Sequence, residues 1–274
     1  MQVTESQLVT LGPAGTFSEL AAQTWLKQQS LDLTINIQDS LPAVIEAVNE
    51  SQLGLTPIEN LSEGFVSPVV DSLVHKSLHI IAELTLPVEF QILTNHPKPR
   101  SIYAQFVAAG QCRKALQQLA LPVTHTSSNS ESLNSLLGTS EPSAALVPSH
   151  IQCPDQLTLL SSRAADIAHN ETRFVVLSAN NLAPAYDPNR RWKSSVLLID
   201  DNDHPGLLVD SLSVFARRAI NLTSIVSRPT GGGFGQYHFF IDFDGHIQQP
   251  HVQEALEQLA KLNHLRWLGS YQAA

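Results

Sequence analysis

The segment Asn170-Glu171-Thr172-Arg173-Phe174-Val175-Val176-Leu177 joins polar side chains to an apolar, strand-like run. A second segment of the same kind reads Thr56-Pro57-Ile58-Glu59-Asn60 and is followed by Glu63-Gly64. More than a hundred residues separate the two segments along the chain. Each segment places polar groups beside a predicted core strand, where a pocket can be built. These two strand ends are therefore candidate parts of one site.

The first 78 residues alternate between predicted strands and predicted helices. Strands are expected at 7–11, 33–37 and 53–58. Helices are expected after Phe17, after Ser40, which is a candidate cap, and after Val66. Strand–helix alternation of this kind predicts an α/β domain with parallel strand pairing.

A second lobe is predicted beyond a long β-rich run at 79–94. The alternation continues there at 111–119, 123–126, 132–137 and 144–147. The chain then returns to the strand after Arg173. We expect a domain over 1–180 with two lobes, at about 1–78 with 166–180 and at 79–165. This arrangement resembles the layout of periplasmic binding proteins, in which the ligand lies between the lobes.

The stretch 179–192 is rich in Asn, Pro and Asp, which predicts a domain boundary. After it, strands are expected at 195–200, 222–227, 237–243 and 267–271, and helices after Pro205 and over 252–262. The strand at 237–243 alternates between apolar and more polar residues, so one of its faces is strongly apolar. The order β-α-β-β-α-β predicts a ferredoxin-like domain over 193–274.

Composition excludes several classes of function. The 274 residues are 43% hydrophobic and 15% charged, which supports a sizeable core. The net charge of −9 argues against a nucleic-acid partner, because no basic stripe can pair with phosphates. No apolar run has the length of a membrane span and no signal peptide is evident, so we expect a cytoplasmic protein without a membrane partner. Cys112 and Cys153 form no Cys-x-x-Cys pair, and no metal site is expected.

Several segments can carry chemistry, and each has a plainer structural interpretation. The turn Gly12-Pro13-Ala14-Gly15-Thr16-Phe17-Ser18 leads from a strand into a helix, so its N–H groups can receive an anion or form an ordinary capped turn. The triplet Gly231-Gly232-Gly233 lacks the Lys and the helix of a phosphate loop, which indicates a hairpin turn. Arg173 has a planar fork that can bind a carboxylate or form a structural salt bridge. Glu59 is either a site residue or a surface charge that ends a strand.

Together these segments resemble the prephenate dehydratase family across nearly the whole chain, in its bacterial, monofunctional form with a C-terminal ACT domain. The matching segments keep the family's order and spacing. They are the turn at 12–18 with Ala21-Ala22, Pro57-Ile58-Glu59-Asn60 with Glu63-Gly64, Gln111-Cys112, Asn170 with Thr172-Arg173-Phe174, Asn221-Leu222-Thr223, and Ser227-Arg228-Pro229. The resemblance implies a two-lobed, periplasmic-binding-protein-like catalytic domain followed by a ferredoxin-like ACT domain.

The resemblance also implies an enzyme, a carbon–oxygen lyase of phenylalanine biosynthesis. It would convert prephenate to phenylpyruvate, carbon dioxide and water without a cofactor, because aromatisation drives the step. Its catalytic residues would be Thr172, Asn60 and Gln111, with the Thr172 hydroxyl donating a hydrogen bond to the leaving oxygen. The substrate-binding residues that it implies are Arg173, Gly15, Thr16, Ser18, Glu59 and Phe174.

The ACT resemblance implies phenylalanine as an effector and a homodimer or homotetramer, since such domains usually bind effectors at a subunit interface. The effector residues would be Gly206, Leu207, Leu208, Asn221, Leu222, Ser227, Arg228 and Pro229.

Five departures from the family pattern keep other hypotheses open, and one of them is the absence of the usual Ser-His-Pro segment from Ala104-Gln105-Phe106. Leu61 stands where Ser or Thr is usual, and Ser128-Asn129-Ser130 stands where Ser-Thr-Ala is usual. Val226 replaces a usual Glu and Leu207 a usual Ala, which leaves the phenylalanine response open. The alternatives are a non-catalytic sensor of prephenate or an amino acid, a prephenate decarboxylase, or an arogenate dehydratase. The retained Thr172 argues against the decarboxylase.

Overall fold

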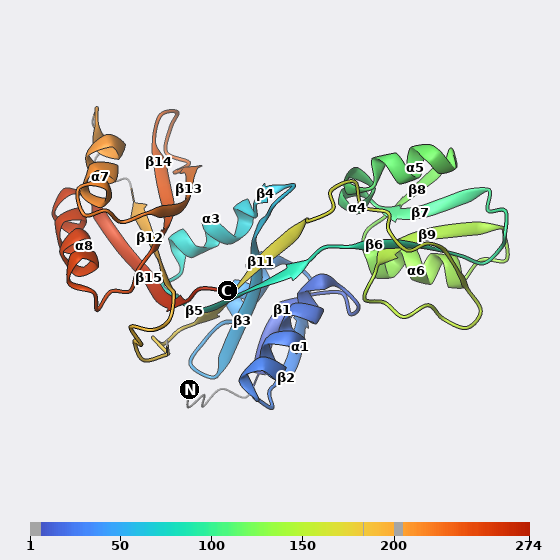
Figure 1. Cartoon of the computed structure of the whole chain (residues 1–274), viewed down its shortest axis with the longest axis horizontal. Helices are drawn as coiled ribbons and strands as arrows, with labels where there is room; N and C mark the ends of the chain where they lie inside the picture. Colours follow the sequence, from blue (N-terminus) through green and yellow to red (C-terminus); the bar gives the residue numbers. More distant parts are fainter. Residues whose placement is uncertain (1–6, 183, 200–204) are drawn as a thin grey trace.

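The computed structural model describes residues 7–182, 184–199 and 205–274 and places them in three bodies (Figure 1). A central sheet with its helices lies between a second α/β lobe, drawn in green, and a C-terminal domain, drawn in orange and red. None of the helices in these described ranges combines the length and apolar character needed to span a bilayer.

The central lobe is built on a mixed sheet in the order β2-β1-β3-β11-β5, with β4 paired to β3. Its strands are β1 (Gln7–Leu11), β2 (Thr34–Gln38), β3 (Gln52–Asn60), β4 (Gly64–Phe65), β5 (His79–Pro87) and β11 (Glu171–Ser178). Its helices are α1 (Phe17–Gln29), α2 (Leu41–Ala47) and α3 (Ser67–His75). Strand β1 pairs in parallel with β2 and β3, as the alternation predicts. Strand β11 runs antiparallel to both β3 and β5, because the chain enters it on its return from the second lobe.

The second lobe has its own mixed sheet, in the order β10-β6-β9-β7-β8. Its strands are β6 (Phe90–Thr94), β7 (Ser101–Gln105), β8 (Val123–Thr126), β9 (Ser143–Pro148) and β10 (Thr158–Ser161), and its helices are α4 (Phe106–Gln111), α5 (Arg113–Leu119) and α6 (Asn129–Leu137). The expected lobe boundary at 79 differs from the structure, because β5 is hydrogen-bonded to β11 in the central sheet. The second lobe therefore starts near β6.

The C-terminal domain confirms the expected ferredoxin-like order. Its elements are β12 (Trp192–Ile199), α7 (Leu207–Ala216), β13 (Leu222–Pro229), β14 (Tyr237–Asp244), α8 (Pro250–Leu262) and β15 (His264–Gln272). The sheet runs β13-β14-β12-β15, and its paired strands are antiparallel. One face is covered by the two helices, whose apolar residues Val214, Phe215, Val252 and Leu259 pack on Ile241 and Phe243.

The other face of this sheet packs directly on the central lobe. Phe240 and Leu268 of the C-terminal domain share one hydrophobic core with Ile80 and Leu177 of the central lobe. Strand β15 crosses β5 so closely that a Cβ at Gly269 would lie 2.1 Å from the carbonyl oxygen of Ile80, and the φ of Gly269 is +153°. Only glycine meets both demands. The linker at 179–192 thus joins two bodies that share a core.

Candidate active site at the lobe junction

The ends of β3 and β11 carry residues predicted for catalysis, and the strands pair there. Asn60 lies opposite Thr172, and Glu59 lies opposite Arg173. The Nδ2 group of Asn60 donates a hydrogen bond of 2.8 Å to the Oγ1 atom of Thr172, and both residues are buried. Successive side chains of a strand point to opposite faces. The Asn60–Thr172 pair therefore lies on one face of the sheet and the Glu59–Arg173 pair on the other.

The orientation of Asn60 is set by the turn that follows it. Its Oδ1 atom accepts hydrogen bonds from the backbone N–H groups of Ser62 (2.9 Å) and Glu63 (3.1 Å) and from the Ser62 hydroxyl (2.8 Å). These three donors leave the amide nitrogen to face Thr172. Because Asn60 donates to Oγ1, the Thr172 hydroxyl keeps its own proton for another acceptor, and none is present among the described residues. Thr172 can therefore donate to a ligand.

Gln111 reaches this pair from the second lobe. Its Nε2 group donates to the Glu63 carboxylate (3.2 Å), and its Oε1 atom accepts from the Nδ2 group of Asn170 (3.1 Å). Since the N–H of Glu63 also bonds to Asn60, one polar chain runs from Thr172 through Asn60 and Glu63 to Gln111. The structure thus brings the three expected catalytic residues into one network.

Asn170 extends this network and was not among the expected site residues. It is 4% exposed, and its Oδ1 atom is buried without a hydrogen-bond partner. A buried acceptor that lacks a donor is uncommon in proteins and calls for an explanation. Asn170 is therefore a candidate to accept a hydrogen bond from a ligand. In the sequence, only its position two residues before Thr172 indicated that it belongs to the site.

The turn at 12–18 forms the N-terminal end of α1, as expected. The N–H of Gly15 donates to the Glu19 carboxylate at 2.6 Å, and Thr16 makes no side-chain cap bond to the helix. Gly15 and Thr16 are partly exposed, whereas Ser18 is buried. The turn therefore presents N–H groups that a carboxylate can approach, with Glu19 as an example within the chain.

Residues of the second lobe contact this turn. The Ser130 hydroxyl donates to the backbone carbonyl of Ala14. The ring of Phe17 packs edge-on against Phe90 (5.7 Å) and His150 (5.1 Å). Desolvation lowers the pKa of His150, although a backbone hydrogen bond with Gly15 acts in the opposite direction. The turn thus lies at the junction of the two lobes, and His150 joins it there without any motif that could have marked it.

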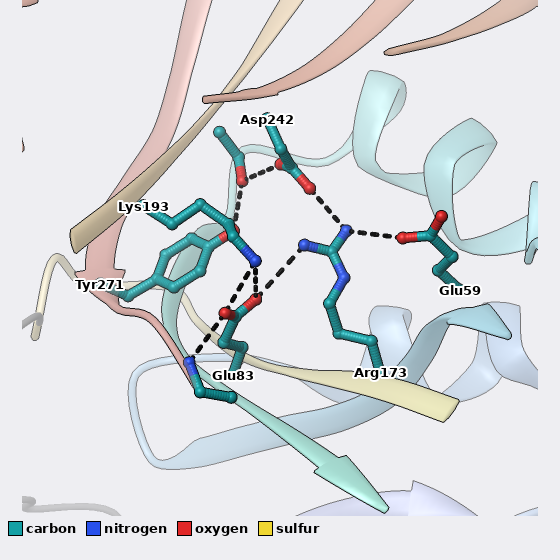
Figure 2. A network of polar contacts seen from close by, with 8 residues as sticks. Glu59, Glu83, Arg173, Lys193, Asp242 and Tyr271 are labelled. Carbon is teal, nitrogen blue, oxygen red and sulfur yellow. Dashed lines mark hydrogen bonds and ion pairs between the residues drawn. The ribbon is translucent and has the colours of Figure 1, made fainter. Parts of the chain in front are cut away.

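Arg173 has a different environment from the one expected (Figure 2). Its Nη2 atom lies 2.5 Å from Asp242 Oδ2 and 3.5 Å from Glu59 Oε2, and its Nη1 atom lies 3.3 Å from Glu83 Oε2. Burial alone lowers the pKa of Arg173, but Asp242 and Glu83 raise it above its usual value, so the group is cationic. The guanidinium faces three carboxylates of the protein, on the sheet face opposite Thr172. This geometry disagrees with the expectation that Arg173 and Glu59 bind substrate beside Thr172.

Phe174 also differs from its expected role. It is 1% exposed and packs among Leu55, Leu84 and Val176 in the core of the central lobe. A fully packed ring supports the strand and has no surface left for a ligand.

The expected effector residues lie at separate places within one chain. Gly206 precedes α7, with a φ of +96°, and Leu207 and Leu208 begin that helix. Asn221 and Leu222 lie at the start of β13 and Ser227–Pro229 at its end, roughly 20 Å apart at the rise of a strand. A pocket of amino-acid size within one chain cannot reach both ends of β13.

Arg228, one of the expected effector residues, makes a further ion pair between the domains. Its Nε and Nη2 atoms each lie 2.7 Å from an oxygen of Asp71 in α3. In the part of the chain that the structure describes, no three His, Cys, Asp or Glu side chains are grouped as a metal ion would need.

Fold and site together define a two-lobed α/β protein, with a polar network at the lobe junction and a ferredoxin-like domain packed behind it. Residues 8–182 match the family model described as prephenate dehydratase, and residues 195–261 match that of the ACT domain. The chain belongs to the prephenate dehydratase family and carries an ACT domain.

Individual relatives agree with this assignment. The chain is 31% identical to the prephenate dehydratase of Amycolatopsis methanolica, over 98% of this chain and 89% of that protein. It resembles the crystal structure of the Arthrobacter aurescens prephenate dehydratase in complex with L-Phe, with a TM-score of 0.86 and 30% identity over 98% of this chain and 90% of that one. A structure described as GqqA, a novel type of quorum quenching acylases, has a TM-score of 0.79 at 24% identity over 98% of each chain, which shows a shared fold.

Proposed function

We propose that this chain is an active prephenate dehydratase that forms phenylpyruvate, carbon dioxide and water from prephenate. The bond from the ring to its carboxylate breaks, and the electron pair enters the ring as the aromatic system forms. The C4–O bond breaks at the same time, and the departing oxygen takes up one proton from the solvent and leaves as water. The atoms and electrons of this reaction balance without an oxidant or a reductant.

The observation that carries this proposal is the hydrogen bond from Asn60 to Thr172 at the lobe junction. A threonine hydroxyl is far too weak an acid to release its proton fully. By accepting a hydrogen bond from Asn60, the hydroxyl becomes a better donor to the leaving oxygen. A positioned donor that meets charge developing in the transition state typically contributes about 10²- to 10³-fold in rate.

The substrate carboxylates need partners other than Arg173, which is engaged on the opposite face. The N–H groups that follow Gly15 in the turn, at Thr16–Ser18, support this role, because a helix N-terminus attracts an anion and the Gly15 N–H is already bonded to Glu19. Gln111 and Asn170 would orient the substrate through neutral hydrogen bonds, since both lie in the network that reaches Thr172.

Incubation of the purified protein with prephenate tests the proposal. Phenylpyruvate, followed by its absorbance at alkaline pH and identified by mass spectrometry, is the expected product. A product that has lost carbon dioxide but kept its hydroxyl would indicate a decarboxylase. Preference for arogenate would indicate an arogenate dehydratase. Binding of prephenate in calorimetry without any product would indicate a sensor and contradict the proposal.

We further propose that phenylalanine inhibits the enzyme through the ACT domain in a homodimer or homotetramer. The likeness to a structure solved with L-Phe supports the ligand. The separation of the expected effector residues within one chain supports a site between subunits. Light scattering should show an oligomer, and phenylalanine should lower turnover. A monomer whose turnover is insensitive to phenylalanine would contradict this part.

The domain boundaries are part of the same proposal, with the catalytic domain over 1–180 and the ACT domain over 193–274. The matched ranges 8–182 and 195–261 support these limits. Limited proteolysis should cut first within 180–192, and a first cut inside either domain would contradict the boundaries.

A further inference from the structure

The strand that carries Thr172 is attached to the C-terminal domain directly behind that residue. Thr172 meets Asn60 on the face at the lobe junction, at 2.8 Å. The next residue, Arg173, meets Glu59 on the opposite face, at 3.5 Å. These pairs are consecutive rungs of one antiparallel ladder. A shift of Arg173 is therefore passed to Thr172 through a single, planar peptide unit.

Asp242 of β14 makes the shortest of the Arg173 ion contacts (Figure 2). It is fully buried, and its second oxygen accepts a hydrogen bond of 2.5 Å from the Ser195 hydroxyl. Because the Ser195 proton points to Asp242, the Tyr271 hydroxyl donates to Ser195, at 2.6 Å. A carboxylate held at both oxygens inside a packed sheet has one position available, so it fixes the place of the guanidinium.

Of the three carboxylates around Arg173, Asp242 has the strongest influence on the position of the guanidinium. Glu83 is neutralised by Lys193, whose Nζ atom lies 2.8 and 3.0 Å from its two oxygens. Glu59 is the most distant partner of Arg173 and the most exposed, with 32% of its side chain accessible. Solvent weakens the attraction of Glu59, whereas the buried Asp242 acts in a low dielectric.

We propose that Asp242 is a positioning residue for the lyase reaction. Through its ion pair with Arg173, Asp242 holds β11 in the position in which the Thr172 hydroxyl points at the leaving oxygen. The inference rests on the proposed function, since it names Thr172 as the donor. Without the Asp242 carboxylate, the guanidinium keeps only Glu59 and Glu83 as partners and is no longer held toward β14. A donor moved from its place is lost mainly in the transition state, so kcat falls more than KM rises. The ACT domain then takes part in catalysis even when no effector is bound.

Asp242→Asn tests the inference because it removes the charge and keeps the shape. We expect kcat to fall about 10- to 100-fold, the range for a misplaced group, with KM within about threefold of wild type. Asp71→Asn is the matched control, since it breaks another ion pair between the domains, the one with Arg228, away from β11. Measured without phenylalanine, it should keep kcat within about twofold. Circular dichroism and thermal unfolding establish that both variants are folded.

The background variant Thr172→Ala separates positioning from a general structural effect. There, Asp242→Asn should cause no further loss of kcat, because the donor is already absent. An equal fold-loss in both backgrounds, or a folded Asp242→Asn enzyme with kcat within twofold of wild type, overturns the inference.

A second variant covers the case in which Asp242→Asn does not fold. Arg173→Lys keeps the charge but has one nitrogen in place of the separate Nη1 and Nη2 atoms that contact Glu83 and Asp242, so kcat should again fall with KM nearly unchanged. A rise in KM alone would return Arg173 to substrate binding and overturn the inference. If the wild-type enzyme forms no phenylpyruvate, the proposed function fails first and the inference fails with it. If the wild-type enzyme forms phenylpyruvate and the variants are as fast as wild type, the inference fails and the proposed function stands.

Discussion

Of the two substitutions Asn60→Ala and Asn60→Asp, the one that lowers stability more should lower turnover less. Asn60→Ala removes the acceptor of three hydrogen bonds from Ser62 and Glu63, whereas Asn60→Asp keeps it. At about 1 kcal/mol for each of these three bonds, the Ala variant should be about 2 to 3 kcal/mol less stable than the Asp variant. The Asp variant loses only the two donor contacts, to Thr172 (2.8 Å) and to the carbonyl of Glu171 (3.1 Å).

Turnover should follow the opposite order because of the Thr172 proton. In Asn60→Asp, a carboxylate oxygen replaces the amide nitrogen, so the Thr172 hydroxyl turns and donates to it. The leaving oxygen of the substrate then loses its donor, and kcat should fall about 10²- to 10³-fold, or about 3 to 4 kcal/mol. In Asn60→Ala, the hydroxyl remains free but is less well held, so the loss should be smaller.

Denaturant unfolding and the phenylpyruvate assay measure the two rankings on the same preparations. We expect Asn60→Asp to be the more stable and the slower variant. A folded Asn60→Asp enzyme that is faster than Asn60→Ala would refute the direction assigned to the hydrogen bond.

Three further predictions concern packing and thiol chemistry. Gly269→Ala should lower the melting temperature sharply in a thermal scan, because its Cβ would lie 2.1 Å from the carbonyl of Ile80; an unchanged melting temperature would contradict the close crossing of β15 and β5. Phe240→Ala should cost about 3 to 5 kcal/mol in denaturant unfolding, since the ring is fully buried in the core shared by the two domains, and a cost below 1 kcal/mol would contradict that core. Burial raises the pKa of the Cys112 thiol to about 12, so at pH 8 only about one part in ten thousand is thiolate. A thiol reagent should therefore label the exposed Cys153 in the native protein and both cysteines only after denaturation; rapid native labelling of Cys112 would be inconsistent with its burial.

Periodicity was enough to predict most elements and the order of the C-terminal domain. Strand β14 shows why: its Phe239, Ile241 and Phe243 pack beneath the helices as the alternating pattern predicts. The same pattern assigned Asp242 to the more polar face, and the structure buries that face against the central lobe. Burial by a second domain leaves no local signal, because it depends on contacts between residues far apart in sequence.

The candidate site could be predicted only in part for a related reason. Asn60, Gln111 and Thr172 were recognised by their motifs, and the structure joins them in one network. The face on which Arg173 lies depends on the register of β11 against β3 and β5, which neighbouring residues do not encode. A motif therefore marks Arg173 as special without telling whether it faces a ligand or a domain interface.

Prephenate turnover by Thr172→Ala and Thr172→Ser, measured beside wild type, tests the central claim most directly. The account predicts phenylpyruvate from wild type, a loss of at least about 10²-fold in kcat for Ala, and retention of most of the rate for Ser, which keeps a hydroxyl donor. A Thr172→Ala enzyme that forms phenylpyruvate at the wild-type rate would contradict it.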